Sequence, residues 1–543
     1  MVSGPRPAIW VSVFTYARGT LHAIGNPVAA LPPKSWSMVA WASVAVFLVA
    51  LTYLLTFVLG LICFLFGLLT LLAMLKALSP LGVLLGLFTF ILGATVLWSL
   101  LPRRIPFQTN GVPVDLSHEP RLSAEIAALA NALNEKMPDE VYLVPVANAA
   151  VLEHGKRRIM LLGLPLLQLL TVSQFRAILA HEFGHYYSGD TRMGPWIFRA
   201  RMNMAQVINR LGGDSAVLSF LSHWAVVAIL RLIVLGGLSL WWKLFNRLAQ
   251  HVSRKQEYRC DELACHIAGS ESLEQGLRSV ILAGAAFAAY VNHVVIPVAV
   301  GGFRPQLGDG FGRFLRAPEI AHAASAVLDK QLASHTSDPM DSHPPLSARI
   351  GKARALSIAV VNSDGRPAVS LFEDLPRLEV QLLARLLPAL NPGALKPMEW
   401  DTAGSVVYIP LWRSEVAKVA PALNAVTIHT LPAILTNLAP IAGRIPDPPG
   451  TLLTREQRAG RAADGIAHAL TLALLDHGWK LRMQPGEFYV ENETGARLNP
   501  RTVIEELRKG KRTADTWPHF CDANAIGDWP LAPQATETAS QSV

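Results

Sequence analysis

Charge and cysteine are scarce in this chain of 543 residues. Only 16% of its residues are charged and 51% are hydrophobic, and the mean hydropathy is +0.32. Ordinary soluble domains carry about 25% charged residues, so the composition excludes a chain built only of such domains, and it excludes disordered and collagen-like chains. Four cysteines are too few and too scattered for a disulfide scaffold or a four-cysteine zinc site.

Long uncharged runs account for the low charge. Residues 38–75 form a run of 38 residues without charge, and a further 25 uncharged residues, 77–101, follow Lys76. Both runs exceed the ~18–20 apolar residues that cross a bilayer, and both are longer than the apolar region of about 7–15 residues in a signal peptide. The sequence therefore predicts a permanent transmembrane helical hairpin over residues 38–102.

Basic residues flank this hairpin on one side of the membrane. The first 37 residues carry Arg6, Arg18 and Lys34 and no acid, and Arg103-Arg104 follow the second run, whereas the turn has only Lys76. By the positive-inside bias, both ends of the hairpin are cytoplasmic. Residues 1–37 are therefore predicted to be a cytoplasmic N-terminal segment.

The rest of the chain changes character twice. Residues 103–365 are predicted to form a mixed domain, with a helical, membrane-associated excursion over residues 194–250. Ordinary soluble composition follows over residues 366–530, which predicts a small α+β module, and residues 531–543 are predicted to be a disordered tail. The predicted fold class is mainly α with a small β-sheet.

Local patterns place several elements. The predicted elements of the mixed domain are a helix over 124–134, strands over 141–144 and 158–162, and a short helix over 164–170. Thr171 and Gln174 form a capping box that opens a further helix. The apolar run 280–300 contains Asn292, His293 and Pro297, so we interpret it as buried core or the wall of a cavity.

Turn and cap residues organise the C-terminal module. Thr454 and Gln457 cap a helix that runs to about Asp476, the Pro485-Gly486 turn joins two strands, and Asn499-Pro500 opens another helix. The basic run 508–512 is interpreted as a solvated face.

The helix that follows Thr171 carries the H-E-F-G-H sequence at residues 181–185. On a helix, His181 and His185 at positions i and i+4 project from one face, so both imidazoles can bind one Zn²⁺, with Glu182 beside them to act on a water. The motif therefore predicts the chemistry of a metalloprotease.

A catalytic zinc also requires a third protein ligand and an open position for water. Glu257 and Asp261 lie one turn apart on a second predicted helix, where two acids repel unless a cation or a histidine N–H lies between them. We expect Glu257 to be the ligand and Asp261 to orient a histidine. Glu262 and His251 are the next candidates for the third ligand.

These blocks resemble a known family. H-E-F-G-H, then S-R-x-x-E-x-x-x-D from Ser253, then S-H-P-P from Ser342 with Arg349 beyond it, are similar to the integral-membrane zinc endopeptidases that include the heat-shock protease HtpX and the type I CAAX prenyl proteases. The similarity spans about residues 115–350. It departs from the family at Cys260, where a small residue such as alanine is usual, and residues 366–543 have no recognised counterpart.

The resemblance implies roles for seven residues. The domain would be a gluzincin-type zincin that binds one Zn²⁺ per chain through His181, His185 and Glu257, with Glu182 as general base and Asp261 supporting the ligands. His343 and Arg349 would hold substrate or the developing oxyanion. Strands near 141–144 or 149–153 are expected to bind extended substrate by β-augmentation.

The resemblance also implies partners and a location. We expect protein or peptide substrates and the lipid bilayer as partners, with no nucleic acid. The expected location is the bacterial inner membrane, with the catalytic domain on the cytoplasmic side. Membrane protein quality control or processing is the expected role.

Two other function classes compete with this interpretation. An intramembrane protease of the site-2 type requires the metal motif within an apolar span, whereas this motif helix contains Gln174 and Arg176. A non-catalytic membrane scaffold with a structural zinc site has no need of Glu182. An intact H-E-x-x-H sequence therefore favours the endopeptidase.

The metal ligands also constrain the topology. His185 precedes the excursion and Glu257 follows it, so the chain between them must cross the membrane an even number of times, either none or two. The first limb, 193–211, contains three arginines, each of which costs ~2.5–3.5 kcal/mol near the bilayer centre. We therefore expect this limb to stay cytoplasmic or interfacial, and the second limb, 216–242, to dip into the membrane or pack against the hairpin.

Overall fold

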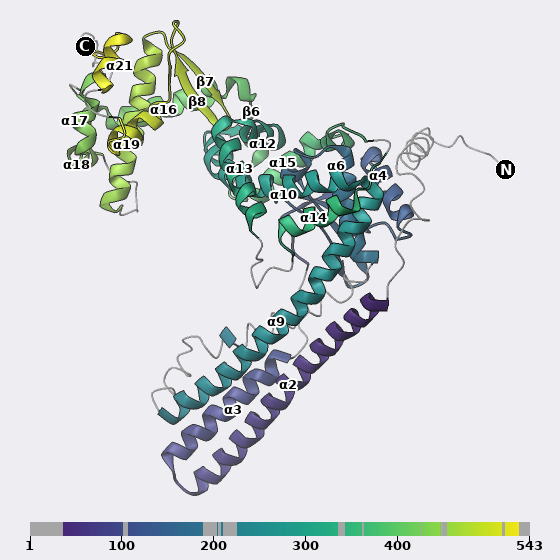
Figure 1. Ribbon diagram of the computed structural model, residues 1–543. Helices are drawn as coiled ribbons and strands as arrows, with labels where there is room; N and C mark the ends of the chain where they lie inside the picture. Colours follow the sequence, from purple (N-terminus) through teal and green to yellow (C-terminus); the bar gives the residue numbers. More distant parts are fainter. Residues whose placement is uncertain are drawn as a thin grey trace, which may run out of the picture. The chain divides into compact units, whose positions relative to one another are not determined.

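A computed structural model describes the chain in several stretches. The described residues are 36–100, 107–187, 204, 208–209, 225–334, 343–360, 363–424, 426–445, 447, 453–512 and 516–531. The fold is mainly helical with small sheets, as the sequence predicts (Figure 1). The chain divides into two compact units, the first formed by Met1–Gly284 with Ala326–Leu378 and the second by Ala285–Ser325 with Glu379–Val543. The domain borders expected from the sequence stay predictions.

Helices α2 (Trp36–Lys76) and α3 (Pro80–Leu100) form the predicted hairpin. Within them, Val46–Lys76 and Pro80–Trp98 are long and apolar enough to cross a membrane. Glycines set their separation: a Cβ on Gly67 would lie 2.1 Å from the backbone nitrogen of Phe90, and one on Gly93 would lie 2.2 Å from that of Phe64. Small residues are therefore required where these two backbones meet, as is common between membrane helices.

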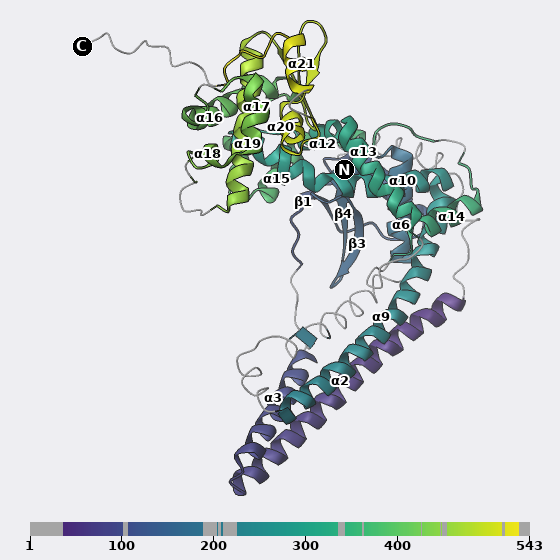
Figure 2. The ribbon, with the colours of Figure 1, turned by 60° about the vertical axis from the view of Figure 1, so that its left-hand side comes forward.

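A third long helix, α9 (Ala225–Ala268), lies beside the hairpin in both views (Figures 1 and 2). Its Leu238 packs in a cluster with Phe88, Leu92 and Val96 of α3, and its Phe245 packs on Leu48 and Val49 of α2. The second limb of the predicted excursion therefore packs against the hairpin, which is one of the two expected arrangements.

The first limb of the excursion lies mostly outside the described residues, as does the turn at 212–214. Its Met204 is described, and it packs among Phe88, Leu92 and Leu238, with its Sδ 3.7 Å from the Thr56 hydroxyl. The limb therefore reaches the hairpin at this residue, which the sequence interpretation did not expect. The expectation rested on the free-energy cost of burying the three arginines, although apolar residues such as Met204 lie between them.

A four-stranded sheet lies in the first unit. Strands β1 (Val112–Val114), β2 (Glu140–Val144), β4 (Arg157–Gly163) and β3 (Ala149–His154) lie in that order, with β2 parallel to β4 and the other pairs antiparallel. The predicted strands at 141–144 and 158–162 are confirmed. Of the two expected edge strands, however, 141–144 is wrong because the three-residue strand β1 covers it, whereas 149–153 does form the edge.

Helices α4 (Pro120–Ala132) and α6 (Val172–Tyr187) are joined by a buried ion pair. Arg176 of α6 donates two hydrogen bonds to the carboxylate of Glu125 at 2.8 and 2.7 Å, and both side chains are nearly inaccessible to solvent. The predicted capping box also forms, because the Thr171 N–H donates to the Gln174 side chain at 3.0 Å and the Gln174 N–H donates to the Thr171 hydroxyl at 3.3 Å. The start and the direction of α6 are therefore fixed by polar contacts.

Helix α6 also packs closely against α9. Gly184 faces Cys260 of α9, and a Cβ at position 184 would lie 2.9 Å from the Cys260 Sγ and 3.0 Å from its Cβ. Real Cβ atoms do not approach other atoms that closely, so only glycine allows this separation. At the end of α6, the Tyr186 hydroxyl donates to the Ile159 carbonyl of β4 at 3.2 Å, which ties the helix to the sheet.

The apolar run predicted as buried core or cavity wall spans the end of α10 (Ser270–Tyr290), the π-helix η2 (Val291–Val295) and α11 (Ile296–Val300). By length and composition, Ser270–Val300 could also cross a membrane. Tyr290 is fully buried against Phe311 and Phe314 of α12 (Leu307–Arg316), however, and Asn292, His293 and Pro297 line a cavity. This environment agrees with the cavity-wall interpretation.

The C-terminal elements follow the predicted caps and turns. Helix α19 (Arg455–Asp476) begins with the Thr454 and Gln457 capping box, strands β7 (Lys480–Gln484) and β8 (Glu487–Glu491) flank the Pro485-Gly486 turn, and α20 (Pro500–Arg508) begins after Asn499. The remaining helices and strands are α5 (Leu164–Leu167), β5 (Phe303–Arg304), α12 (Leu307–Arg316), α13 (Pro318–Ala333), α14 (Leu346–Leu356), α15 (Leu375–Leu386), β6 (Lys396–Pro397), the π-helix η6 (Gly404–Tyr408), α16 (Ile409–Val419), α17 (Leu431–Thr436), α18 (Ala439–Ala442), β9 (Arg497–Leu498) and α21 (Thr516–Ala523), with short 3₁₀ turns between them.

Glu125→Ala leaves the Arg176 guanidinium buried without its main partner. We expect the free energy of unfolding to fall by about 3–5 kcal/mol, the range for breaking a buried ion pair from one side. Glu319→Ala makes the same change at an exposed site on α13 and should stay within about 0.5 kcal/mol of the parent. Thermal unfolding followed by circular dichroism compares them, and equal midpoints would contradict the importance of the pair.

Gly184→Ala overpacks the contact between α6 and α9. We expect a loss of about 1–3 kcal/mol in unfolding free energy, partly restored when Cys260→Gly is added to the same chain. Gly284→Ala is the control, because nothing lies within 4 Å of a Cβ at that helical position and alanine favours a helix by about 1 kcal/mol. The packing argument fails if the two alanine variants unfold at the same temperature.

Candidate metal centre

Three potential metal ligands come together where α6 packs on α9. His181 and His185 project from one face of α6 and Glu257 projects from α9, and one ligand atom from each lies within 4.8 Å of the others. His181 and Glu257 are buried, whereas His185 is partly exposed. A cluster of two imidazoles and a carboxylate, open on the side of His185, can hold a metal ion.

The second nitrogen of each imidazole has its own partner. His181 Nδ1 lies 2.9 Å from Asp261 Oδ1, and His185 Nδ1 lies 3.6 Å from the buried Cys260 Sγ. The Nε2 atoms face Glu257 instead, at 3.5 Å for His181 and 3.7 Å for His185. Both rings are therefore oriented with Nε2 toward the shared space, as a metal ligand requires.

Asp261 is held in turn by Arg349 of α14. The guanidinium donates to both carboxylate oxygens, at 2.8 and 2.7 Å, and all of these groups are buried. Burial opposes the charged form of Asp261, but the charge and hydrogen bonds of Arg349 outweigh it and lower the pKa of Asp261 to about 2. Asp261 is therefore ionised and able to orient His181. Arg349 itself is turned toward Asp261 and away from solvent, an arrangement that suits support of the site better than contact with substrate.

His343 and Glu182 complete the set of residues expected from the sequence. His343 Nδ1 lies 2.8 Å from Glu257 Oε2, and the His343 side chain is 52% exposed, so it lies at the open side of the cluster. Glu182 interacts electrostatically with His181, His185, Glu257 and His343, and burial raises the pKa of its carboxyl. The structure thus brings together all seven expected residues, from three separate helices and the segment before α14.

The charges of the cluster favour a bound cation. Among the described residues, Arg349 is the permanent positive charge that acts on Glu257 and Asp261, against the three carboxylates of Glu182, Glu257 and Asp261. Burial disfavours a charged His181, but hydrogen bonds to Asp261 and Glu257 outweigh it and raise the pKa of His181 to about 10. A site that draws a proton onto a buried imidazole in this way stabilises positive charge, and its donor set of two nitrogens and one oxygen fits a zinc ion.

The next candidates for a third ligand do not join the cluster. Glu262 pairs with Arg259 at 2.6 Å on its own helix. His251 is absent from the group that could hold a metal among the described residues.

Sequence reasoning missed the contacts of Gly184 and Cys260. The motif pattern treats position 184 as variable, and Cys260 stood out only as a departure from the resembled family. The available signal was Gly184 itself, which lies between His181 and His185 in the motif. A glycine inside a helix often marks a place where another backbone approaches closely.

Comparisons with known proteins agree with this geometry. The model of peptidase family M48 matches residues 116–357, which include every residue of the cluster. Protease HtpX of Stutzerimonas stutzeri (strain A1501) is 27% identical over 166 residues, which cover 29% of this chain and 55% of HtpX. The chain thus spans about half the length of this curated relative, and no solved structure matches it significantly. Residues 116–357 of the chain form a domain of peptidase family M48.

Proposed function

We propose that this protein is a membrane-anchored, zinc-dependent endopeptidase. The observation that supports this most directly is the convergence of His181, His185 and Glu257 within 4.8 Å, inside the M48 domain. The helix that supplies Glu257 also packs along the apolar hairpin, so the metal cluster and the membrane anchor share one helix.

The proposed metal is one Zn²⁺ per chain. Two imidazole nitrogens and one carboxylate oxygen are the protein ligands of many catalytic zinc sites, which keep a fourth position open. The partly exposed His185 and the exposed His343 leave one side of the cluster accessible to water. A structural zinc site would instead need a fourth protein ligand, and the group found among the described residues has three.

The chemistry is divided between the metal and Glu182. When bound, Zn²⁺ supplies Lewis acidity that activates a water and polarises the scissile carbonyl. Glu182 accepts a proton from the attacking water and delivers it to the leaving amine.

The surrounding residues position these groups. Asp261, held by Arg349, keeps the His181 ring oriented, and Cys260 contacts the corresponding nitrogen of His185. His343 is the residue of this group with the most exposed side chain, and we assign it to substrate or oxyanion contact. Arg349 is assigned a supporting role, because both of its bonds to Asp261 are buried.

The proposed substrates are proteins or peptides bound in extended form. Among the described residues, strand β3 is an edge of the sheet next to α6, so a substrate strand can be added to it through main-chain hydrogen bonds. Such bonds carry little sequence preference, which suits a role in membrane protein quality control or processing. We place the catalytic domain on the cytoplasmic side of a bacterial inner membrane, because basic residues flank the hairpin at both ends.

Digestion of casein by the full-length protein tests the proposed activity. We expect cleavage that stops when a zinc chelator is added and returns when Zn²⁺ is restored, because no other group of the site can replace the metal. Digestion that continues in the chelator would contradict a metallopeptidase. No digestion in zinc-loaded protein would favour the scaffold alternative.

Glu182→Gln should abolish hydrolysis while zinc content stays near that of the parent. A general base acts in the transition state and does not bind the metal, so the loss should appear in the rate, by about 10²–10⁴-fold or more. Metal analysis of the purified variant is the matched control. Full activity in this variant would exclude the assigned base.

Glu257→Ala should lose zinc, whereas Asp261→Asn should keep it with about 10–100-fold weaker affinity. The difference follows from their positions, since Glu257 faces both Nε2 atoms and Asp261 contacts only the far side of His181. Titration of each apo variant with zinc measures this. Full zinc occupancy in Glu257→Ala would mean that the third ligand is another residue.

A further inference from the structure

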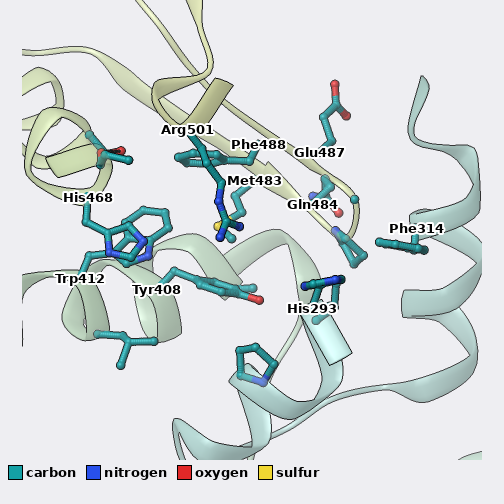
Figure 3. Close-up of a pocket in the computed structure, with 18 of the residues that line it drawn as sticks. His293, Phe314, Tyr408, Trp412, His468, Met483, Gln484, Glu487, Phe488 and Arg501 are labelled. Carbon is teal, nitrogen blue, oxygen red and sulfur yellow. Dashed lines mark hydrogen bonds between the residues drawn. The ribbon is translucent and has the colours of Figure 1, made fainter. Parts of the chain in front are cut away.

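The second unit contains a cavity of about 400 Å³ that lies outside the metal centre (Figure 3). Its walls come from η2, α12, η6, α16, α19, the β7–β8 hairpin and the start of α20. This volume is within the range of sites that bind small ligands, about 300–1,000 Å³, and it is too small for a folded partner. It can accept a bulky side chain.

Irregular helical backbone borders this cavity on two sides. Within the described residues, the π-helical segments are η2 and η6, and both line it: η2 through Asn292 and His293, and η6 through Tyr408. π-Helical turns are rare, well under about 1% of residues, and occur frequently at functional sites. That both π-helical segments line the same cavity is a second observation, separate from its volume, that marks it as a candidate functional site.

Aromatic side chains form the inner wall. Trp412 contacts both Tyr408 and Phe488, with ring centroids 5.8 and 5.4 Å away, and His468 stacks on Trp412 at 5.4 Å. Figure 3 shows Tyr408, Trp412, Phe488 and Met483 around a common space. Such a wall favours an aromatic or other large apolar group, which gains ring contacts in addition to burial.

The Tyr408 hydroxyl adds a polar group to this apolar wall. Tyr408 is 9% exposed, and no hydrogen bond to its hydroxyl is found among the described residues. In Figure 3 the hydroxyl points to the side where His293 lies. A hydroxyl on the cavity wall can donate or accept a hydrogen bond with a bound group.

The charged residues at the mouth restrict the occupant further. Glu415, Asp464 and Glu487 face one guanidinium, that of Arg501, which pairs with Asp464 at 3.2 Å. Glu415 lies 2.9 Å from the His468 ring, and Glu487 is exposed and in no ion pair among the described residues. Among the side chains that line the cavity, three acids against one guanidinium favour a basic occupant over an anionic one such as a fatty acid; Lys418 and Arg461 act on Glu415 from outside the lining, so the argument depends mainly on Glu487.

A second hollow continues from the first around the hairpin turn. It shares Gln484, Pro485 and Glu487 with the first. Its far side is lined by Asp309, Arg316 and Arg313, and Arg313 pairs with Asp309 and Asp401 at 2.8 Å. Gly486, at φ +81°, allows the turn to rest on α12, since a Cβ there would lie 2.9 Å from the Phe314 carbonyl oxygen. The turn thus separates an apolar hollow from a charged one. Neighbouring residues of an extended chain could place an apolar side chain in the first hollow and a charged side chain near the second.

We propose that this cavity is a binding site for an unfolded polypeptide segment, which packs one aromatic side chain against the wall formed by Tyr408, Trp412 and Phe488 and places a neighbouring lysine or arginine near Glu487. In combination with the proposed peptidase function, the site would hold substrates away from the metal centre. The binding itself does not depend on hydrolysis, so it is tested separately.

The probe is a fluorescein-labelled peptide, Gly-Ser-Lys-Trp-Lys-Ser-Gly, measured by fluorescence anisotropy with the full-length Glu182→Gln protein in nanodiscs of zwitterionic lipid. We expect saturable binding that weakens at least about tenfold when the peptide tryptophan is replaced by alanine, because truncation of an aromatic anchor typically has effects of this size. Replacement of both peptide lysines by glutamate should weaken binding by a similar factor. These peptide changes need no alteration of the protein.

Two pairs of protein variants locate the site. Phe488→Ala removes a ring from the wall, whereas Tyr489→Ala removes one from the next residue of β8, which does not line the cavity. Glu487→Lys reverses a charge at the mouth, whereas Glu493→Lys makes the same change at an exposed residue outside it. We expect at least about tenfold weaker binding for Phe488→Ala, about threefold for Glu487→Lys and no change for either control.

Several outcomes would overturn the proposal. These are equal affinity of the tryptophan and alanine peptides, equal effects of Phe488→Ala and Tyr489→Ala, and tighter binding of the glutamate peptide. Displacement of the peptide by micromolar oleate would assign the cavity to a lipid and would also refute the proposal. Peptide binding without any casein digestion would support this site while contradicting the proposed peptidase function.

Discussion

The contact between α6 and α9 at Gly184 and Cys260 determines the position of every residue in the metal cluster. Two imidazoles on α6 and a carboxylate on α9 can share one ion only if the helix axes approach closely, and a side chain at position 184 would prevent that approach. The pair Glu125–Arg176 fixes α6 on its other side, and Tyr186 ties its end to the sheet. The close approach of α6 and α9 at Gly184 is therefore a precondition for the three candidate ligands to lie together.

Helix α9 connects this site to the membrane. It runs without a break for 44 residues, and the stretch from Leu238 in the apolar cluster to Asp261 is about 35 Å long at 1.5 Å per residue. One continuous helix therefore contributes both to the packing on the hairpin and to the group of candidate metal ligands.

Local sequence signals predicted the elements well and their neighbours less well. Capping boxes at Thr171 and Thr454 act within a few residues, so the helix starts were correct. Edge strands depend on which other strands pair with them, and the short strand β1 carried too weak a pattern to reveal that it covers β2. Asn292 and His293 are polar residues in an apolar run, which is why the sequence predicted that they lie in the core or line a cavity. The aromatic residues of the same cavity lie more than a hundred residues later in the chain, so the sequence did not predict them. The contact of Met204 with the hairpin was not predicted either, because the nearby arginines indicated that this segment stays out of the membrane.

X-ray absorption spectroscopy at the zinc edge on the purified full-length protein identifies the atoms that bind the metal. We expect one zinc per chain, with two imidazole nitrogens at about 2.0–2.1 Å, oxygen ligands from Glu257 and water, and no sulfur. A shell that contains sulfur at about 2.3 Å, or one closed by four protein ligands, would contradict a catalytic centre at His181, His185 and Glu257.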